Sequence, residues 1–317
     1  MRRLARLAQR ALAAALVFTA LGCQAGIDSL RFCGGNTAPD AARQDRLLQF
    51  ASIVERALGQ TGAEVALVSR SGLNLQRFGL RYSHAGFALR DEAPGRWAVR
   101  QLYYACDERR SRLYDQGLAG FVMGNDDPAM GHVSIVWWPD QAPASVAGPA
   151  GPAEPAPLAR TVFDKARALR LLAPDYSANA YPFSLRYQNC NQWVAEMLAT
   201  AWAGLADGEP LRAQAQQWLR AQAYAPKPVP VASHWLMAAG GFVPWLRYDD
   251  HPEADRFALR FHTSLPTDIE AFVRAQQPQA QRVEICHAGA KVVIRRGWQP
   301  MGTVCEAGAG DEVLTLD

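Results

Sequence analysis

The first 25 residues constrain this chain more than any later feature, because they decide where it folds. Four arginines lie within the first ten residues, an apolar run extends from Ala11 to Leu21, and small residues follow up to Ala25. A basic start, a short apolar core and a small-residue end are typical of a secretory signal peptide. The run is shorter than the roughly 20 apolar residues that span a bilayer. We therefore expect an exported protein, with residues 1–25 as its signal, that folds in an oxidising compartment.

Two processing routes are open at the end of this segment. Cleavage after Ala25 releases a soluble periplasmic protein, which is the route we expect. Alternatively, Cys23 in the Gly22-Cys23 pair carries a lipid and anchors a lipoprotein in the membrane, although Ala20 stands where such sites usually have Leu. We expect contact with a membrane only in that second case. The net charge of +3 comes from the signal's arginines, so the near-neutral mature chain argues against a nucleic-acid partner.

The cysteine count sharpens this expectation. Five cysteines follow the signal peptide, and in an oxidising compartment pairing is the default. Cys286 and Cys305 flank part of a predicted hairpin, and Cys33 and Cys106 can tie the N-terminal segment to a strand end. Sequence does not determine connectivity, but an odd count leaves one thiol over. If both pairs form, Cys190 is the free thiol.

Apolar periodicity predicts a helix and a sheet first, and more helices later. Residues 39–60 have helical spacing. The segments with strand-like patterns are 64–70, 84–90, 96–104 and 132–139. The later segments with helical spacing are 158–172, 190–204, 210–224 and 267–277. This order of elements predicts an α+β fold, not an alternating βαβ one.

Composition divides the mature chain into four parts. They are a helix and sheet half at 26–140, an Ala/Pro/Gly-rich linker or exposed loop at 141–157, a helical half at 158–224 and a C-terminal extension of unknown role at 225–317. Within the extension, Thr267 or Asp268 is expected to cap the short helix. The tail from residue 282 predicts two strands.

One cysteine stands at the start of a predicted helix. Cys190, Trp193, Val194 and Met197 recur at helical spacing, and Asn189 is a good N-cap. Backbone N–H groups at a helix start favour a thiolate over a thiol, so we expect a reactive nucleophile with a lowered pKa. The alternative is a small buried residue that fills the first turn. An unpaired thiol in an oxidising compartment argues against that alternative.

A thiol nucleophile needs a base to take its proton, and His84 is the best placed of the six histidines. It lies on a predicted strand, on the same side as Gly86 and Ala88, whose small side chains leave room beside the imidazole. The alternative is a strand histidine that only bonds its neighbours. His132 and His287 are expected to be ordinary solvated residues.

The segment 248–257 is dense in possible metal ligands, because it combines four carboxylates with His251. It has no familiar ligand spacing, so a solvated polar loop is the expected structure and no metal is expected. The sequence also has no Gly-rich phosphate loop and no Gly-x-Ser-x-Gly elbow. We therefore expect no cofactor.

The histidine and cysteine motifs together resemble the circularly permuted branch of the NlpC-like, papain-fold cysteine enzymes. The matching residues are His84, Gly86 and Phe87 in the first motif and Asn189, Cys190, Trp193 and Val194 in the second. The mature chain also resembles an uncharacterised bacterial family of exported proteins, marked by YSHAGFA, AYPFSLRYQNCNQWV and DDHP segments. The first resemblance implies a permuted papain-like fold, in which an antiparallel sheet packs against helices. Helical and C-terminal hairpin additions complete this expectation.

The resemblance also implies roles for particular residues. Cys190 is the nucleophile, His84 is its general base, and a polar residue on the next strand orients the imidazole. Gln101 is our choice for that residue, with Arg100 and Tyr103 as the alternatives because sequence does not settle which face of the strand points inward. An arginine there would repel the imidazolium.

The expected function is that of an exported thiol hydrolase or acyltransferase acting on an amide or ester bond. Peptidoglycan peptides are the first choice of substrate for this compartment, and lipid or protein acyl groups are the second. The rival expectation is a catalytically inactive envelope protein, either binding or structural, that keeps the papain-like fold. Under that rival the thiol at residue 190 is inert.

Overall fold

The computed structural model describes residues 40–317 apart from 74, 76–77, 92–95, 126, 128, 140–156 and 208–209. All described residues belong to one unit of the chain, Pro39–Asp317. The predicted signal peptide, Cys33 and the predicted linker up to residue 156 lie outside the described residues. No helix in the described part combines the length and apolar character that crossing a membrane requires.

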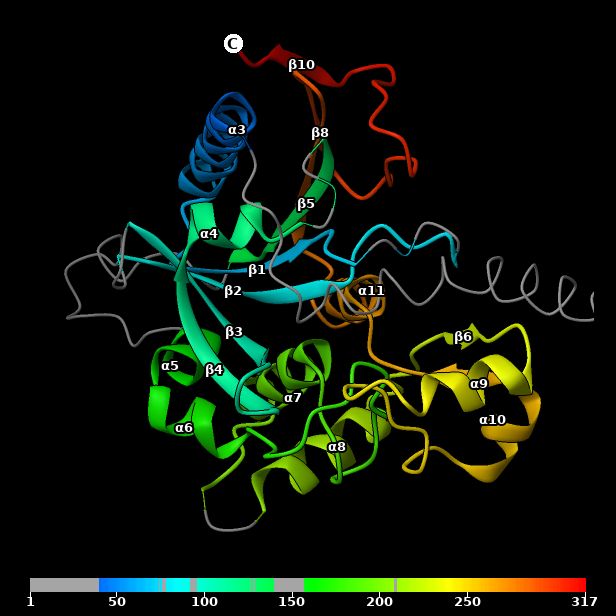
Figure 1. The fold of residues 1–317 in the computed structure, drawn as a ribbon. Coiled ribbons are helices and arrows are strands. Elements are labelled where there is room, and N and C mark those ends of the chain that lie inside the picture. The colour runs from blue at the N-terminus through cyan, green and yellow to red at the C-terminus, as the bar shows by residue number, and fades with distance from the viewer. Residues whose placement is uncertain are drawn as a thin grey trace, which may run out of the picture. The chain divides into compact units, whose positions relative to one another are not determined.

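A large antiparallel sheet organises this unit, with the strand order β10-β9-β8-β5-β1-β2-β3-β4 (Figure 1). Its strands are β1 (Val65–Arg70), β2 (His84–Arg90), β3 (Trp97–Ala105), β4 (Arg110–Gly117), β5 (Met130–Trp137), β8 (Gln281–Ala288), β9 (Lys291–Arg296) and β10 (Glu312–Thr315). The four early strands and the two of the tail were predicted from sequence and are confirmed. The strands β4 and β10 were not predicted. Because β8 pairs with β5, the C-terminal tail joins the same sheet as the early strands.

Helices cover both faces of the central strands. On one face, α3 (Ala41–Gln60) and α4 (Leu118–Met123) pack against Ala66, Val68 and Ala88. On the other face lies α7 (Cys190–Trp202), whose Trp193 ring is 6.0 Å from the ring of Phe87. Neighbouring strand residues point to opposite faces, so Phe87 and Ala88 separate these two layers. Figure 1 shows α3 and α4 on one side of β1 and β2 and α7 on the other.

The remaining helices of the body are α5 (Pro157–Phe163), α6 (Lys165–Arg170), α8 (Leu211–Ala221) and α11 (Pro266–Gln276). The predicted helix 158–172 is thus two helices, because Asp164 ends the first and accepts a hydrogen bond from the N–H of Arg167 at the start of the second. The predicted cap of α11 is wrong. Leu265 precedes it without a side-chain cap bond, and Pro266 starts it, since its fixed φ suits a first helical position.

Residues 228–262 form a small lobe beside this body, and we refer to this segment as the lobe. It contains α9 (His234–Gly240), α10 (Glu253–Ala258) and a two-stranded sheet of β6 (Pro228–Pro230) and β7 (Arg260–His262). No residue of α9 or α10 is buried. Both helices therefore lack the apolar core that fastens α3 and α7 to the sheet.

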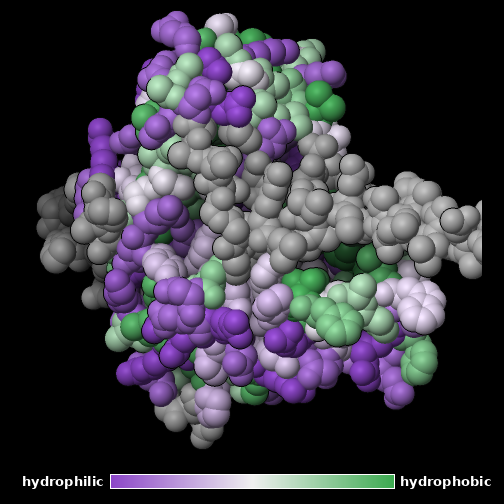
Figure 2. Space-filling model, in the orientation of Figure 1, coloured by the Kyte–Doolittle hydropathy of each residue, from purple (hydrophilic) through white to green (hydrophobic). Residues whose placement is uncertain are grey.

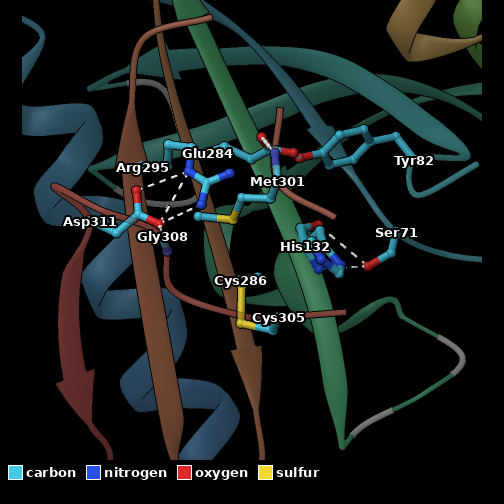
Figure 3. The surroundings of a disulfide bond; sticks show 10 residues. All are labelled: Ser71, Tyr82, His132, Glu284, Cys286, Arg295, Met301, Cys305, Gly308 and Asp311. Atoms are coloured by element: carbon cyan, nitrogen blue, oxygen red, sulfur yellow. Dashed lines mark hydrogen bonds and ion pairs between the residues drawn. A yellow bond between two sulfur atoms is a disulfide. The ribbon is translucent and has the colours of Figure 1, made fainter. Parts of the chain in front are cut away.

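The predicted disulfide between Cys286 and Cys305 is confirmed, and it closes a loop of 19 residues against β8 (Figure 3). Cys106 is also disulfide-bonded, and its partner lies outside the described residues. Cys190 is a free thiol. The expectation that His132 and His287 are solvated is wrong, because both lie on central strands of the sheet and are buried.

Candidate active site

Cys190 is the first residue of α7, as the sequence predicted. Asn189 caps this helix, since its Oδ1 accepts a hydrogen bond from the N–H of Gln192 at 2.7 Å. The Nδ2 of Asn189 donates to the carbonyl of Ala178 and to the Oγ1 of Thr263, each at 3.0 Å. Three segments of the chain therefore meet at the residue before the thiol, and they hold the start of the helix in one position.

The thiol lies against the beginning of β2. Backbone N–H groups of Ala85, Cys190 and Asn191 all interact with the sulfur and favour its thiolate form. The Nδ2 of Asn191 donates to the carbonyl of Ser83 at 3.1 Å, which ties the start of α7 to the residue before β2. The N–H groups of Cys190 and Asn191 are those that a helix start offers to a nucleophile, whereas that of Ala85 comes from β2.

The expected lowering of the thiol pKa is wrong, however. Only 5% of the surface of Cys190 is exposed. Burial of the sulfur outweighs the N–H groups and raises the pKa of the Cys190 thiol to about 11, because the charged form loses its hydration. In this structure the thiol is therefore protonated at neutral pH.

His84 is the first residue of β2, and its ring leaves the strand on the face covered by α4. Its ring centroid is 5.9 Å from that of Phe121 and 5.8 Å from that of Tyr103. The Nε2 of His84 lies 2.5 Å from the Oε1 of Gln101. An amide oxygen can only accept, so this bond assigns the imidazole proton to Nε2 and leaves Nδ1 unprotonated.

Gln116 orients the amide that His84 contacts, and sequence analysis missed it. The Nε2 of Gln101 donates to the Oε1 of Gln116 at 2.7 Å, which turns the Gln101 oxygen towards the imidazole. Gln116 lies on β4, directly opposite Val99 in the β3–β4 pairing, so its side chain is on the same face as that of Gln101. Since β4 was not predicted, no sequence signal could place Gln116 beside the site.

Arg70 supplies the local positive charge. It pairs directly with His84 across β1 and β2, and its guanidinium lies 5.2 Å from the centre of the Phe121 ring. Burial first, and then the charge of Arg70, lower the pKa of His84 to about 3, whereas the bond to Gln101 opposes this shift. The same charge favours the thiolate of Cys190. The imidazole is therefore neutral at physiological pH.

Gln101, and neither alternative, makes the side-chain hydrogen bond to His84. Arg100 points to the opposite face, where its guanidinium forms two bonds to Asp115 at 2.7 and 2.9 Å and donates to the carbonyl of Val162. Tyr103 contacts the imidazole edge to face and is partly exposed. The ion pair with Asp115 therefore holds Arg100 away from the imidazole.

The histidine and the cysteine thus lie at the start of β2 on opposite faces of the sheet. The sulfur interacts with the N–H of Ala85, the residue that follows His84, while the imidazole points to the α4 face. The β2–β3 pairing runs from Phe87–Arg100 to Arg90–Trp97, so both groups lie beyond its end. The catalytic roles of Cys190, His84 and Gln101 stay predictions.

The DDHP segment is not the solvated loop that was expected. Asp250 accepts a hydrogen bond from the N–H of Tyr181 at 2.9 Å, and the buried His251 donates through Nε2 to the carbonyl of Asn179 at 2.7 Å. The segment therefore fastens the lobe to the loop that precedes Cys190.

Comparisons with known proteins place the chain in a family. No curated protein and no solved structure matches it. A family model described as "Uncharacterized protein conserved in bacteria (DUF2145)" matches residues 57–273, which is more than half of the chain and includes both motifs of the candidate site. On this ground the chain belongs to the bacterial family DUF2145.

Proposed function

We propose that this protein is an exported thiol hydrolase or acyltransferase with a permuted papain-like, NlpC-like arrangement of Cys190 and His84. The observation that carries the proposal is a free thiol on a capped helix start, packed against the strand that begins with an imidazole whose Nε2 bonds Gln101. In this arrangement Nδ1 is the basic nitrogen. Gln101 is the positioning residue, and Gln116 holds its amide.

The proposed reaction transfers an acyl group first to the sulfur of Cys190 and then to water or an amine. In the structure the imidazole lies on the other face of β2 from the sulfur, so the reaction requires His84 to turn towards the start of α7. The Nδ1 of His84 then takes the thiol proton while Sγ of Cys190 bonds the carbonyl carbon of an amide or ester. The carbonyl oxygen then carries negative charge, and the N–H groups of Ala85 and Cys190, which interact with the sulfur in the structure, are the proposed donors for it. The imidazolium returns its proton to the leaving amine or alcohol as the C–N or C–O bond breaks. Water or an acceptor amine releases the acyl group and restores the thiol.

The resting pair is neutral, and this limits how the reaction starts. With pKa values of about 11 for the Cys190 thiol and about 3 for the His84 imidazole, about one thiol in 10,000 is ionised at pH 7. The proposal therefore requires that the site opens or binds substrate before the proton moves. Cell-wall peptides are the first proposed substrates, and lipid or protein acyl groups are the second. The proposed location is the periplasm or, for a lipoprotein, the membrane to which it is anchored.

The second candidate function is an inactive envelope binding protein, and the burial of Cys190 favours it. A small apolar-like thiol under a helix is a common core residue, and a pKa of about 11 suits an inert thiol. The two candidates differ in whether an acyl group ever becomes attached to this sulfur.

Intact-protein mass spectrometry tests the proposal. The oxidised protein is incubated with activated esters and with soluble peptidoglycan peptides at pH 7.5. We expect one acyl group on Cys190, lost in Cys190→Ala and formed much more slowly in His84→Gln. His234→Gln is the matched control, because His234 is exposed on α9. If the folded protein forms no adduct on Cys190 with any of these esters or peptides, the proposed enzyme is wrong and the binding protein remains.

A further inference from the structure

An aromatic stack leads from the lobe to the candidate nucleophile. Trp245 of the lobe lies 6.4 Å, ring to ring, from Tyr104 of β3, and Tyr104 lies 5.1 Å from Tyr176. The hydroxyl of Tyr176 interacts with Cys190, since a thiolate there raises the pKa of Tyr176 further above the value that burial sets. Only 5% of the surface of Trp245 is exposed. The indole is therefore the buried outer end of a stack whose inner end, Tyr176, interacts with the sulfur.

The same part of the lobe holds the loop that runs alongside Cys190. The N–H of Ala178 donates to the carbonyl of Trp245 at 2.8 Å, and the N–H of Arg247 donates to the Oγ of Ser177 at 3.0 Å. Asp250 and His251 add further hydrogen bonds between the lobe and this loop, at residues 179–181. Directly after the lobe, Thr263 accepts a hydrogen bond from Asn189, the cap of the helix that begins with Cys190. Movement of the lobe together with this loop would therefore carry Tyr176 away from the thiol and loosen the start of its helix.

The rest of the lobe is weakly anchored. Its buried side chains are those of Trp245, His251 and Phe261. Trp235 and Phe242, by contrast, are 86% and 89% exposed, and Figure 2 shows hydrophobic surface over the region of α9 and α10. A segment with so few buried apolar contacts opens at a much lower free-energy cost than the sheet. Most of the free-energy cost of opening the lobe therefore comes from the contacts of Trp245.

We propose that the lobe, residues 228–262, together with the attached loop 176–181 is a lid over Cys190, and that Trp245 is the side chain that fastens the lobe against Tyr104. The lid is closed in the structure. This explains why Cys190 is buried and protonated although it stands at a helix start that suits a nucleophile. Opening removes the aromatic cover, returns water to the sulfur and lowers the pKa of the thiol towards its ordinary value. The lid rests on the proposed function in one respect only, namely that Cys190 is covered because it is a nucleophile.

Alkylation of Cys190 by iodoacetamide tests the lid without any substrate. We expect Trp245→Ala to increase the alkylation rate at pH 8 by about tenfold or more, because the rate follows the population of the open form. Trp235→Ala is the matched control, since it removes the same side chain from the exposed side of the same lobe and should leave the rate unchanged. Equal rates in the wild type and both variants would overturn the lid.

Hydrogen exchange of the wild-type protein provides a measurement that does not depend on how the variant folds. We expect the amides of Ala178 and Arg247, which bridge the lobe and the loop, to exchange together and at least about a hundredfold faster than those of Leu67 and Val68 in β1. Exchange of both groups only at the rate of global unfolding would refute an independent lid. If the lid opens but no acyl group ever forms on Cys190, the lid stands and the proposed enzyme fails.

Discussion

Acid should destabilise this protein in part through His84, and the size of that effect can be worked out. The folded protein holds the pKa of His84 at about 3, against 6.5 for a free imidazole. Between these two pH values the unfolded chain binds a proton at this residue and the folded chain does not. The stability from His84 is therefore fully present above pH 6.5 and is lost as the pH falls towards 3.

The linkage relation gives the loss between pH 7 and pH 4. With the two pKa values above, His84 costs about 3 kcal/mol of unfolding free energy over this interval. Replacement by glutamine removes the titration and keeps a polar partner for Gln101. We therefore expect the wild type to lose about 3 kcal/mol more than His84→Gln on going from pH 7 to pH 4.

Urea unfolding with the disulfides intact measures this difference at the two pH values. His132 and His287 are also buried with pKa values of about 4, but both proteins share them, so their contribution cancels in the comparison. His234→Gln is the control, because this exposed residue should leave the pH profile unchanged. Parallel profiles for the wild type and His84→Gln would show that the imidazole is solvated, and the description of the site would be wrong.

Three further predictions address the surroundings of the site and the stability of the fold. Gln116→Met should let the Gln101 amide rotate, so that the His84 proton moves off Nε2, which ¹⁵N NMR detects. Gln116→Glu should keep the proton on Nε2, because the carboxylate still accepts from the Gln101 amide. Identical spectra for both variants would exclude the orienting role of Gln116. Loss of the Cys286–Cys305 bond in a double alanine variant should cost about 3 kcal/mol in urea unfolding, since the bond closes a 19-residue loop. Burial raises the pKa of Asp268 to about 6, so ionisation of this carboxyl lowers the stability of the folded protein as the pH rises through 6. Asp268→Asn should therefore raise the Tm more at pH 7.5 than at pH 4.5. An equal change in Tm at both pH values would contradict this.

Sequence periodicity alone predicted most of the elements that carry the site. The helix α3, the strands β1, β2, β3 and β5 and the helix α7 all have one strongly apolar stripe or face, and a pattern of this kind is visible without knowing the partner element. The edge strand β4 was missed because its side chains are mostly polar and only partly buried, so its sequence RSRLYDQG has no buried face to reveal it. The C-terminal strand β10 was missed for a similar reason.

What only the tertiary structure decided is the chemistry of the site. Sequence identified Cys190 with its cap Asn189, and it named His84 and Gln101, because local rules govern helix starts and strand faces. It predicted a thiol with a lowered pKa, since the helix start is a local feature. Burial of the sulfur reverses that pKa shift, and burial depends on which distant segments pack around it. Burial is a property of the assembled layers, and no spacing along the chain encodes it.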